Sequence, residues 1–496
     1  MLVFVVLAQM LGKGVHMLTI IDSDKTKNES ISLKGKNLFF IGIGGISMSS
    51  LAMISLYGGA KVCGSDRTCS PLTEKMERSG IKIYYSHSAD NLPRECDAVI
   101  FTAAIHNGNP ELSEAKKRGI PCFSRAEFLG KVMLPYRNRI GIAGTHGKST
   151  TTSMAAMIAL QAKTDPTIIS GAELEAIDGA YRIGSNNYFI FEACEYTDSF
   201  LSFHPTTAVI LNIELEHVDY FHSLEQITVS FKKYISKADT AVICIDSTPA
   251  VKAAKEFGGK LVTYSIKSHT SPIKSAVHYF ADKITAHGDK IHFTLVRISD
   301  NNKDVLCVID LNVPGVHNVS DATAAAAACI ENGMSVYSVK AGLRNFKGTK
   351  RRLEYRGTSI HGAAVYDDYA HHPTEIKATL SAARSFGKTV WCVFQPHTYS
   401  RTHGLFDELK LSFGDADRLI ITDIYSAGRE ENRSGVTSEQ LANAITGALY
   451  IPKGKQFEQI SEYISQVTTE DDVVIVMGAG DIITLSAALT DKVKKK

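Results

Sequence analysis

Short apolar runs that end in glycine-rich or polar segments recur along the chain. They lie at 37–43, 97–105, 139–143, 187–191, 207–213, 363–366, 391–394 and 472–477. Some are followed by apolar residues at helical spacing, as at Leu51, Ile54 and Leu56. Buried strands that alternate with amphipathic helices are typical of parallel sheets in α/β proteins. The pattern therefore predicts an α/β fold made of successive units.

The most informative run is Arg139-Ile-Gly-Ile-Ala-Gly-Thr-His-Gly-Lys-Ser-Thr-Thr-Thr-Ser153, an apolar strand that enters a glycine-rich turn and then a helix. Gly144 and Gly147 would let backbone N–H groups face bound phosphates, while Lys148 could reach the outer phosphates and Ser149 could hold Mg²⁺. The strict pattern G-x4-G-K-[ST] is missed, because isoleucine stands where the first glycine is required. The segment predicts a variant phosphate-binding loop; the alternative is an ordinary strand-to-helix turn.

A second glycine-rich turn follows the apolar run that begins at Asn37. Gly42-Ile-Gly-Gly45 opens an expected helix, and Asp66 ends the next strand, where a ribose-binding acid would lie. The dinucleotide fingerprint is imperfect, because Ser47 stands where glycine is required. This unit predicts nucleotide binding of some kind, with a purely structural turn as the alternative.

Acidic residues and a histidine follow two strands expected after the phosphate loop. Glu192 ends one of these strands, and Glu214, Glu216 and His217 follow the other. Ligands of open α/β sheets bind at the carboxyl ends of the strands, and carboxylates there suit Mg²⁺. Taken singly, each residue is more often a solvated loop residue. Together with the phosphate loop they predict a site for one or two metal ions.

Polar clusters continue into the last third of the chain. His317 and Asn318 open an alanine-rich helix, where they could pair with a base edge or cap the helix. The basic run at 346–353 could grip phosphate or be solvated surface. Two further apolar strands are followed by polar clusters at 367–373 and 395–401, and these clusters predict a further ligand-binding site.

Length and composition restrict the possibilities. The 496 residues suggest about three domains. The 54 basic and 52 acidic residues leave a net charge of +2, which gives no basic excess of the kind that indicates a nucleic-acid partner. Nine scattered cysteines form no Cys-x-x-Cys pair, so neither a zinc ribbon nor a disulfide framework is predicted, and a reducing cytoplasm is favoured.

The start of the chain is apolar over residues 1–11, but it has no basic segment before the apolar run and is too short to span a bilayer. We expect residues 1–16 to be an upstream extension of a reading frame whose natural start is Met17. Residues 1–34 are accordingly interpreted as an N-terminal extension.

From about Lys36 to near the C-terminus, the chain resembles the Mur ligases. The ordered motifs that carry the resemblance are Gly-Ile-Gly-Gly-Ile-Ser-Met, Ala-Gly-Thr-His-Gly-Lys-Ser, Phe-Glu-Ala-Cys-Glu-Tyr, Asn-Ile-Glu-Leu-Glu-His, Asp-Asp-Tyr-Ala-His-His-Pro-Thr-Glu, Phe-Gln-Pro-His-Thr-Tyr-Ser-Arg-Thr and Met-Gly-Ala-Gly-Asp-Ile. Within the family, the chain is most similar to the members that attach L-alanine to UDP-N-acetylmuramate in peptidoglycan synthesis.

The resemblance implies three domains. They are a Rossmann-like domain for the UDP substrate over 35–137, a central P-loop ATPase domain with a mostly parallel sheet over 138–343, and a C-terminal Rossmann-like ligase domain over 344–496. It also implies that the lactyl carboxylate attacks the γ-phosphate of ATP, and that the alanine amine then takes the acyl phosphate. ATP and Mg²⁺ are the implied cofactors, UDP-N-acetylmuramate and L-alanine the implied substrates, and neither nucleic acid nor a membrane span is implied.

The resemblance assigns roles by position. The implied catalytic residues are Lys148, His217 and Arg352. The implied metal ligands are Ser149, Glu192 and His217. The implied nucleotide contacts are Gly144, Thr145, His146, Gly147, Lys148, Ser149, Thr150, His317, Asn318, Arg352 and Asp368. The implied substrate contacts are Gly44, Gly45, Asp66, Thr102, Tyr369, His371 and Arg401.

Some positions depart from the family pattern. Cys194 and Glu216 replace common aspartates, and Asp321 replaces a frequent asparagine. Thr398 stands where many members carry an arginine, which leaves Arg401 as the basic candidate for the alanine carboxylate.

Three alternatives to this activity remain. A sister ligase that returns a recovered tripeptide to UDP-N-acetylmuramate would share the nucleotide and metal residues. A nicotinamide-dependent oxidoreductase would use the turn at 42–45 but leave Lys148 and His217 without a role. A noncatalytic nucleotide-binding regulator would release no ADP with any substrate.

Overall fold

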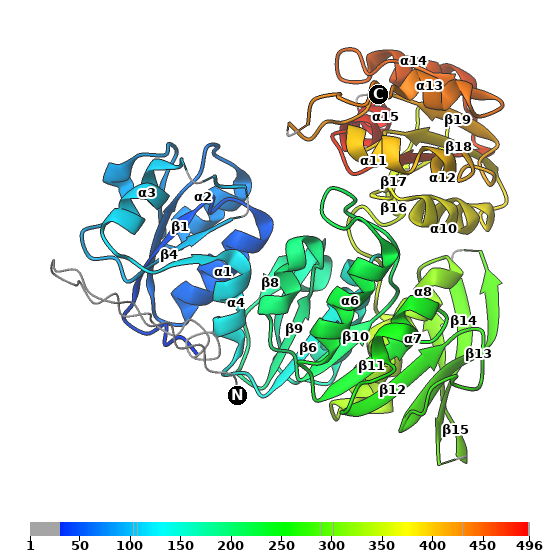
Figure 1. Ribbon diagram of the computed structural model, residues 1–496. Helices are drawn as coiled ribbons and strands as arrows, with labels where there is room; N and C mark the ends of the chain where they lie inside the picture. The colour runs from blue at the N-terminus through cyan, green and yellow to red at the C-terminus, as the bar shows by residue number, and fades with distance from the viewer. Residues whose placement is uncertain are drawn as a thin grey trace, which may run out of the picture.

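The computed structural model describes residues 30–494 apart from 103, 107, 289, 301 and 429. The extension expected over residues 1–16, with a start at Met17, lies outside the described residues. The described chain forms three units, each built on its own sheet (Figure 1). The first unit spans 37–133, the second 138–344 and the third 354–494.

The first unit is a five-stranded parallel sheet of order β3-β2-β1-β4-β5. Its strands are β1 (Asn37–Ile41), β2 (Lys61–Ser65), β3 (Lys82–Tyr84), β4 (Ala98–Phe101) and β5 (Cys122–Ser124). Its helices are α1 (Ile46–Tyr57), α2 (Pro71–Arg78), α3 (Pro110–Lys117) and α4 (Arg125–Met133), with the 3₁₀ turn η1 (Ala89–Asn91). Strand order reverses between β1 and β4, so their carboxyl ends open a crevice of the kind that binds ligands.

The second unit carries a ten-stranded sheet of order β15-β14-β13-β12-β11-β10-β6-β9-β7-β8. The strands are β6 (Asn138–Ala143), β7 (Thr167–Leu174), β8 (Gly179–Arg182), β9 (Tyr188–Glu192), β10 (Thr207–Ile210), β11 (Thr240–Cys244), β12 (Lys260–Ser265), β13 (Val277–His287), β14 (Lys290–Ser299) and β15 (Asn302–Leu311). Pairing is parallel from β7 through β13, and antiparallel edges are added by β8, β14 and β15.

The helices of the second unit bury much of this sheet. They are α5 (Lys148–Gln161), α6 (Leu224–Ile235), α7 (Thr248–Ala254), α8 (Val316–Glu331) and α9 (Val336–Arg344), with the 3₁₀ turns η2 (Glu175–Ile177) and η3 (Tyr196–Ser202). The residues at 324–328 of α8 are all alanine and all buried. Small side chains let helices approach closely, and α8 contacts both α5 and the strands beneath it. This packing fixes α5, and therefore the loop before it, against the sheet.

The third unit is a six-stranded sheet of order β16-β17-β21-β18-β19-β20, parallel except at β16. The strands are β16 (Glu354–Thr358), β17 (Ala364–Asp368), β18 (Thr389–Phe394), β19 (Arg418–Ile421), β20 (Ala448–Tyr450) and β21 (Asp472–Met477). The helices are α10 (Pro373–Arg384), α11 (Tyr399–Gly404), α12 (Phe406–Lys410), α13 (Ser438–Asn443), α14 (Glu458–Val467) and α15 (Ile483–Lys494).

The mixed α/β fold with mostly parallel sheets agrees with the prediction. The last three strands of the second unit form a long hairpin series, in which β13, β14 and β15 have 11, 10 and 10 residues. Among the described residues, no helix is both long and apolar enough to cross a membrane.

Candidate active site

The predicted phosphate-binding loop connects β6 to α5. Gly147 has a φ of +82°, and a Cβ there would lie 2.5 Å from Asp321 Oδ1, so glycine is required on both grounds. Asn212, which follows the neighbouring strand β10, holds the loop: His146 N donates to Asn212 Oδ1 at 2.8 Å, and Asn212 Nδ2 donates to His146 O at 3.1 Å. Helix α5 begins at Lys148, so its first amide groups are directed at this loop, as a phosphate site needs.

Lys148 folds back onto the loop and pairs with a buried acid. Its Nζ donates to Gly144 O at 2.6 Å and to Thr145 O at 3.0 Å, and it lies 3.1 Å from Glu195 Oε2. Burial alone would lower the pKa of Lys148, but the Glu195 charge outweighs it and raises the pKa above its ordinary value. Lys148 therefore stays charged within the loop.

The sequence reading missed Glu195, which has no exposed side-chain surface. His217 Nε2 lies 3.6 Å from Glu195 Oε1, so Glu195 links Lys148 to His217. Burial would raise the pKa of Glu195, but the charges of Lys148 and His217 lower it. The signal available in the sequence was the motif Phe-Glu-Ala-Cys-Glu-Tyr, in which Glu195 follows Glu192 by three residues.

Two of the three predicted metal ligands lie together. Ser149 Oγ donates to Glu192 Oε2 at 2.7 Å, and Gly171 N donates to the same oxygen at 2.9 Å. A hydroxyl and a carboxylate are oxygen ligands of the kind that Mg²⁺ prefers. His217 is joined to the loop through Glu195, and its φ of +54° lies in the left-handed region. Such backbone strain concentrates at functional sites.

A cavity of about 760 Å³ lies between the second and third units. Its volume falls within the range of small-molecule sites. The predicted residues that line it are His146, Gly147, Thr150, His317, Asn318, Arg352 and Asp368. Aromatic side chains from Phe346, Tyr366 and Phe386 form another part of the lining. The cavity thus combines one end of the phosphate loop with apolar surface for a planar group.

Two buried acids face this cavity. Asp368 accepts hydrogen bonds from Leu353 N at 2.6 Å and from Ala370 N at 2.8 Å, so its carboxylate also fixes the chain leading from the second unit to the third. Asp321 is 7% exposed, and burial raises its pKa to about 7 against the opposing effects of Thr151 and Arg352. At neutral pH Asp321 therefore carries only part of a negative charge.

Glu375 of the third unit contacts the phosphate loop directly. Its Oε1 lies 3.2 Å from His146 Nδ1 and 3.7 Å from an Arg352 guanidinium nitrogen, and its Oε2 accepts from His371 N at 3.2 Å. Burial would raise the pKa of Glu375, but the neighbouring His371, His146 and Arg352 hold it well below its ordinary value. The charged Glu375 therefore binds the third unit to the second.

The three residues predicted to hold the amino acid lie close together at the same junction. The ring centroids of Tyr369 and His371 are 5.4 Å apart, and His371 lies 5.6 Å from His397. Arg401 donates to His397 Nδ1 at 2.7 Å and, through Nε, to Glu216 Oε1 at 2.9 Å. Arg401 thus already binds a carboxylate in the structure, which belongs to Glu216 of the second unit.

Neighbouring charges set the protonation of this cluster. Burial, strengthened by the charge of Arg401, lowers the pKa of His371 to about 4, although Glu375 opposes this. The guanidinium carbon of Arg352 lies 5.4 Å from the ring centroid of Tyr369, which is within the range of a cation–π interaction. At neutral pH His371 is uncharged, so Arg401 and Arg352 supply the positive charge here.

The remaining predicted residues form a second group in the first unit. Gly44 N donates to Asp66 Oδ2 at 2.8 Å, and a Cβ on Gly42 would lie 2.7 Å from Thr102 Cγ2. Gly45 is the residue that precedes α1. These residues gather where β1, β2 and β4 end, and none of them lines the 760 Å³ cavity.

Three family models match successive parts of the chain. The Mur ligase family catalytic domain matches residues 37–137, the Mur ligase middle domain matches 142–329, and the Mur ligase glutamate ligase domain matches 351–480. Together they cover most of the chain and follow the order of the three sheets.

Curated relatives match over nearly their whole length. The UDP-N-acetylmuramate–L-alanine ligase of Acetivibrio thermocellus is 45% identical over 457 residues, covering 90% of this chain and 94% of the relative. The enzyme of the same name from Clostridium kluyveri is 41% identical over 460 residues, covering 91% and 97%. A solved UDP-N-acetylmuramate–alanine ligase from Thermotoga maritima superposes with a TM-score of 0.75 at 25% identity, over 92% of this chain and 99% of that one.

Proposed function

Because the chain belongs to the Mur ligase family, we propose that it joins L-alanine to the lactyl carboxylate of UDP-N-acetylmuramate while converting ATP to ADP and phosphate. Relatives at 40–45% identity that bear this activity in their names support the choice of substrates. The structural observation that carries the proposal is the cavity between the second and third units, which brings the phosphate loop close to the charged cluster of the third unit. The reaction belongs to peptidoglycan synthesis.

The cavity supports a specific placement of ATP. The phosphates lie over the loop formed by Gly144, Thr145, His146, Gly147, Lys148, Ser149 and Thr150. The adenine lies near His317 and Asn318, which line the cavity where donor and acceptor groups can reach a base edge. Arg352 contacts phosphate and Asp368 the ribose. The aromatic lining supplies the apolar surface that the base needs.

The oxygen donors beside the phosphate loop fit Mg²⁺. Ser149 and Glu192 would hold one ion, and His217 would contribute to a second. Bound Mg²⁺ neutralises charge on the phosphate oxygens during phosphoryl transfer. Lys148 adds a fixed positive charge in the same region, because Glu195 keeps it protonated.

The reaction itself needs positioning and charge more than an enzyme nucleophile. A lactyl carboxylate oxygen attacks the γ-phosphorus of ATP, and ADP leaves; the alanine amine then attacks the acyl carbon, and phosphate leaves with the former carboxylate oxygen. Arg401 binds the alanine carboxylate, as it binds Glu216 in the structure. Tyr369 and the uncharged His371 border the path of the amine.

The proposed activity also assigns a role to each domain and a cellular location to the protein. We place the UDP part of the substrate on Gly44, Gly45, Asp66 and Thr102 in a domain over 35–137. The ATPase domain is then 138–343 and the ligase domain 344–496, an assignment that the three separate sheets support. The nine cysteines are all free thiols, which supports the reducing cytoplasm where UDP-linked precursors would be used.

The sister activity, attachment of a recovered tripeptide, has weaker support. A solved murein peptide ligase from Psychrobacter arcticus has a TM-score of 0.67, but at 23% identity the likeness extends to the fold alone. The relatives at 40–45% identity favour free L-alanine.

A coupled assay of ADP release tests the proposal. UDP-N-acetylmuramate, ATP and Mg²⁺ are supplied with one amino acid at a time. We expect L-alanine to give the highest rate, and glycine and serine to react poorly. Weak activity with glycine is compatible with the proposal, since one methyl group is worth only about 1–3 kcal/mol of discrimination. ADP release that is independent of every amino acid would contradict the proposal.

A further inference from the structure

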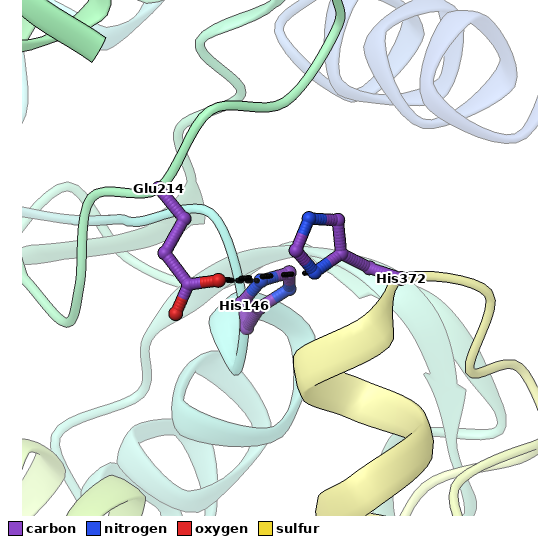
Figure 2. A group of neighbouring side chains, drawn as sticks. All are labelled: His146, Glu214 and His372. Carbon is purple, nitrogen blue, oxygen red and sulfur yellow. Dashed lines mark hydrogen bonds and ion pairs between the residues drawn. The ribbon is translucent and has the colours of Figure 1, made fainter. Parts of the chain in front are cut away.

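Two histidines and a carboxylate converge where the third unit meets the phosphate loop (Figure 2). His146 belongs to the loop, Glu214 follows β10, and His372 precedes α10 of the third unit. His146 Nε2 lies 3.3 Å from Glu214 Oε2, and His372 Nδ1 lies 3.8 Å from the same oxygen. The available ligand atoms all lie within 4.8 Å of one another.

Two of these separations are close to those of a metal site. Zinc binds imidazole nitrogen and carboxylate oxygen at about 2.0–2.2 Å in a tetrahedron, which places neighbouring ligand atoms roughly 3.3–3.6 Å apart. The separations of 3.3 and 3.8 Å lie near that range, and the third, which is at most 4.8 Å, requires the two imidazoles to move toward one another. The ring centroids of His146 and His372 are 4.5 Å apart with planes inclined at 41°, so the imidazoles are not stacked face to face.

The outer nitrogens of both histidines face carboxylates. His146 Nδ1 lies 3.2 Å from Glu375 Oε1, and His372 Nε2 lies 3.7 Å from Glu216 Oε2. Metal-binding histidines usually donate the N–H of the remote ring nitrogen to a carboxylate, which fixes the tautomer and leaves the inner nitrogen free to coordinate. This arrangement orients the inner nitrogen of His146 toward Glu214. The inner nitrogen of His372 lies 3.8 Å from the same carboxylate oxygen and also accepts from Thr374 N at 3.3 Å, so a bound ion would take the place of that long hydrogen bond.

We propose that His146, Glu214 and His372 bind a divalent transition-metal ion of the zinc class, with water in the remaining position. Two imidazoles and one carboxylate form a donor set that suits zinc and disfavours Mg²⁺, which prefers oxygen ligands. The site is distinct from the proposed Mg²⁺ ligands Ser149, Glu192 and His217.

Binding at this site has a consequence for the nucleotide. His146 is part of the phosphate loop, and His146 and Glu214 both line the 760 Å³ cavity. An ion held there ties the loop to the third unit and occupies the phosphate end of the cavity. On the proposed placement of ATP, metal and ATP therefore compete, and by linkage each weakens the binding of the other to the same extent.

The charges around the site are compatible with an ion. Glu214 and Glu375 face His146, and Glu214 and Glu216 face His372. These carboxylates can offset the charge of a bound divalent ion.

Titration of the full-length protein without nucleotide or Mg²⁺ tests the proposal. Co²⁺ serves as the spectroscopic probe, and Zn²⁺ affinity is measured by competition with a chromophoric chelator. We expect one Co²⁺ to give the visible absorption of a low-coordinate site, equimolar Zn²⁺ to abolish it, and millimolar Mg²⁺ to leave it unchanged. A non-hydrolysable ATP analogue should weaken Zn²⁺ binding.

The decisive variant is His372→Asn. His372 Nδ1 accepts from Thr374 N at 3.3 Å and so caps α10, and asparagine retains that cap without an imidazole ligand. The matched control is His361→Ala, which removes an exposed histidine of the same unit. We expect His372→Asn to weaken Zn²⁺ binding at least about tenfold, since even outer-shell changes weaken metal sites by about 10–100-fold, while His361→Ala binds as the wild type does.

Glu214→Gln provides a second variant, which removes a ligand charge but keeps His372 and an amide oxygen that can accept from Thr374 Oγ1, the present donor to Glu214 Oε2 at 2.6 Å. It should weaken Zn²⁺ binding in the same way. Equal Zn²⁺ affinity in the wild type, His372→Asn and Glu214→Gln would overturn the proposal. So would the absence of any Co²⁺ spectrum in the wild type. Neither outcome depends on the ligase reaction, so the two proposals can fail separately.

Discussion

Replacement of Lys148 should affect stability as well as activity, because Lys148 is one half of a buried ion pair. Its Nζ lies 3.1 Å from Glu195 Oε2, and the Glu195 side chain is wholly buried. The Lys148→Ala change therefore leaves a buried carboxylate without its main partner. Breaking a buried pair in this way typically destabilises a protein by about 3–5 kcal/mol.

The expected magnitude lies at the lower end of that range. His217 Nε2 lies 3.6 Å from Glu195 Oε1 and can supply part of the missing charge when it is protonated. A loss of about 3 kcal/mol would lower the melting temperature of the second unit by roughly 6–12 °C, at about 2–4 °C per kcal/mol for 150–250 residues. Ligation should fall by about 10²–10³, since a preorganised charge on the reacting phosphate is lost.

A double substitution separates the two effects. In Lys148→Met with Glu195→Gln, no unpaired charge remains buried, so thermal unfolding should recover most of the lost stability. Ligation, followed by ADP release, should remain low, because neither substitution restores the cation. A Lys148→Ala enzyme that melts like the wild type, or a double variant no more stable than the single one, would refute this reasoning.

Four other outcomes are expected. Arg401→Ala should raise the alanine KM roughly tenfold to hundredfold, the worth of a charged hydrogen bond, and spare the ATP KM; equal effects on both would contradict its assignment. Glu192→Gln should shift the Mg²⁺ titration of ADP release to higher concentration, whereas an unchanged titration would remove Glu192 from the metal site. Burial raises the Asp321 pKa from its ordinary 3.8 to about 7, so the folded protein loses stability as pH rises between these values and the buried carboxyl must ionise. Asp321→Asn should reduce this loss, as measured by thermal unfolding from pH 4 to 8. A lactyl carboxylate labelled with ¹⁸O should transfer one labelled oxygen to phosphate, and unlabelled phosphate would exclude the acyl-phosphate route.

Much of the fold could be predicted from local patterns. Apolar runs that end at glycine or at acids mark β1, β6, β9 and β17, because a parallel strand is buried on both faces while its carboxyl end opens to ligand. The series β13–β15 was harder to predict. The burial pattern of β15 is largely exposed or intermediate although its sequence contains the apolar run Val305-Leu-Cys-Val-Ile309, so an apolar run alone does not distinguish this edge strand from a buried one.

The contacts between side chains could not be predicted from the sequence. The phosphate loop and the strand-end acids follow from motifs, but the pairing of Lys148 with Glu195 depends on the path of the chain after β9. The contacts of His146 with Glu375 and of Arg401 with Glu216 each join segments separated by more than 180 residues. Only the packing of the third unit against the second brings these charges together.

The most direct test of the central claim is a competition between the two acceptors. The protein is given ATP, Mg²⁺ and UDP-N-acetylmuramate with equal concentrations of L-alanine and the recovered murein tripeptide, and the UDP-linked products are identified by mass spectrometry. We predict that UDP-N-acetylmuramoyl-L-alanine accumulates together with an equal amount of ADP. Predominant formation of the UDP-linked tripeptide, or ADP release without any UDP-linked product, would contradict the account.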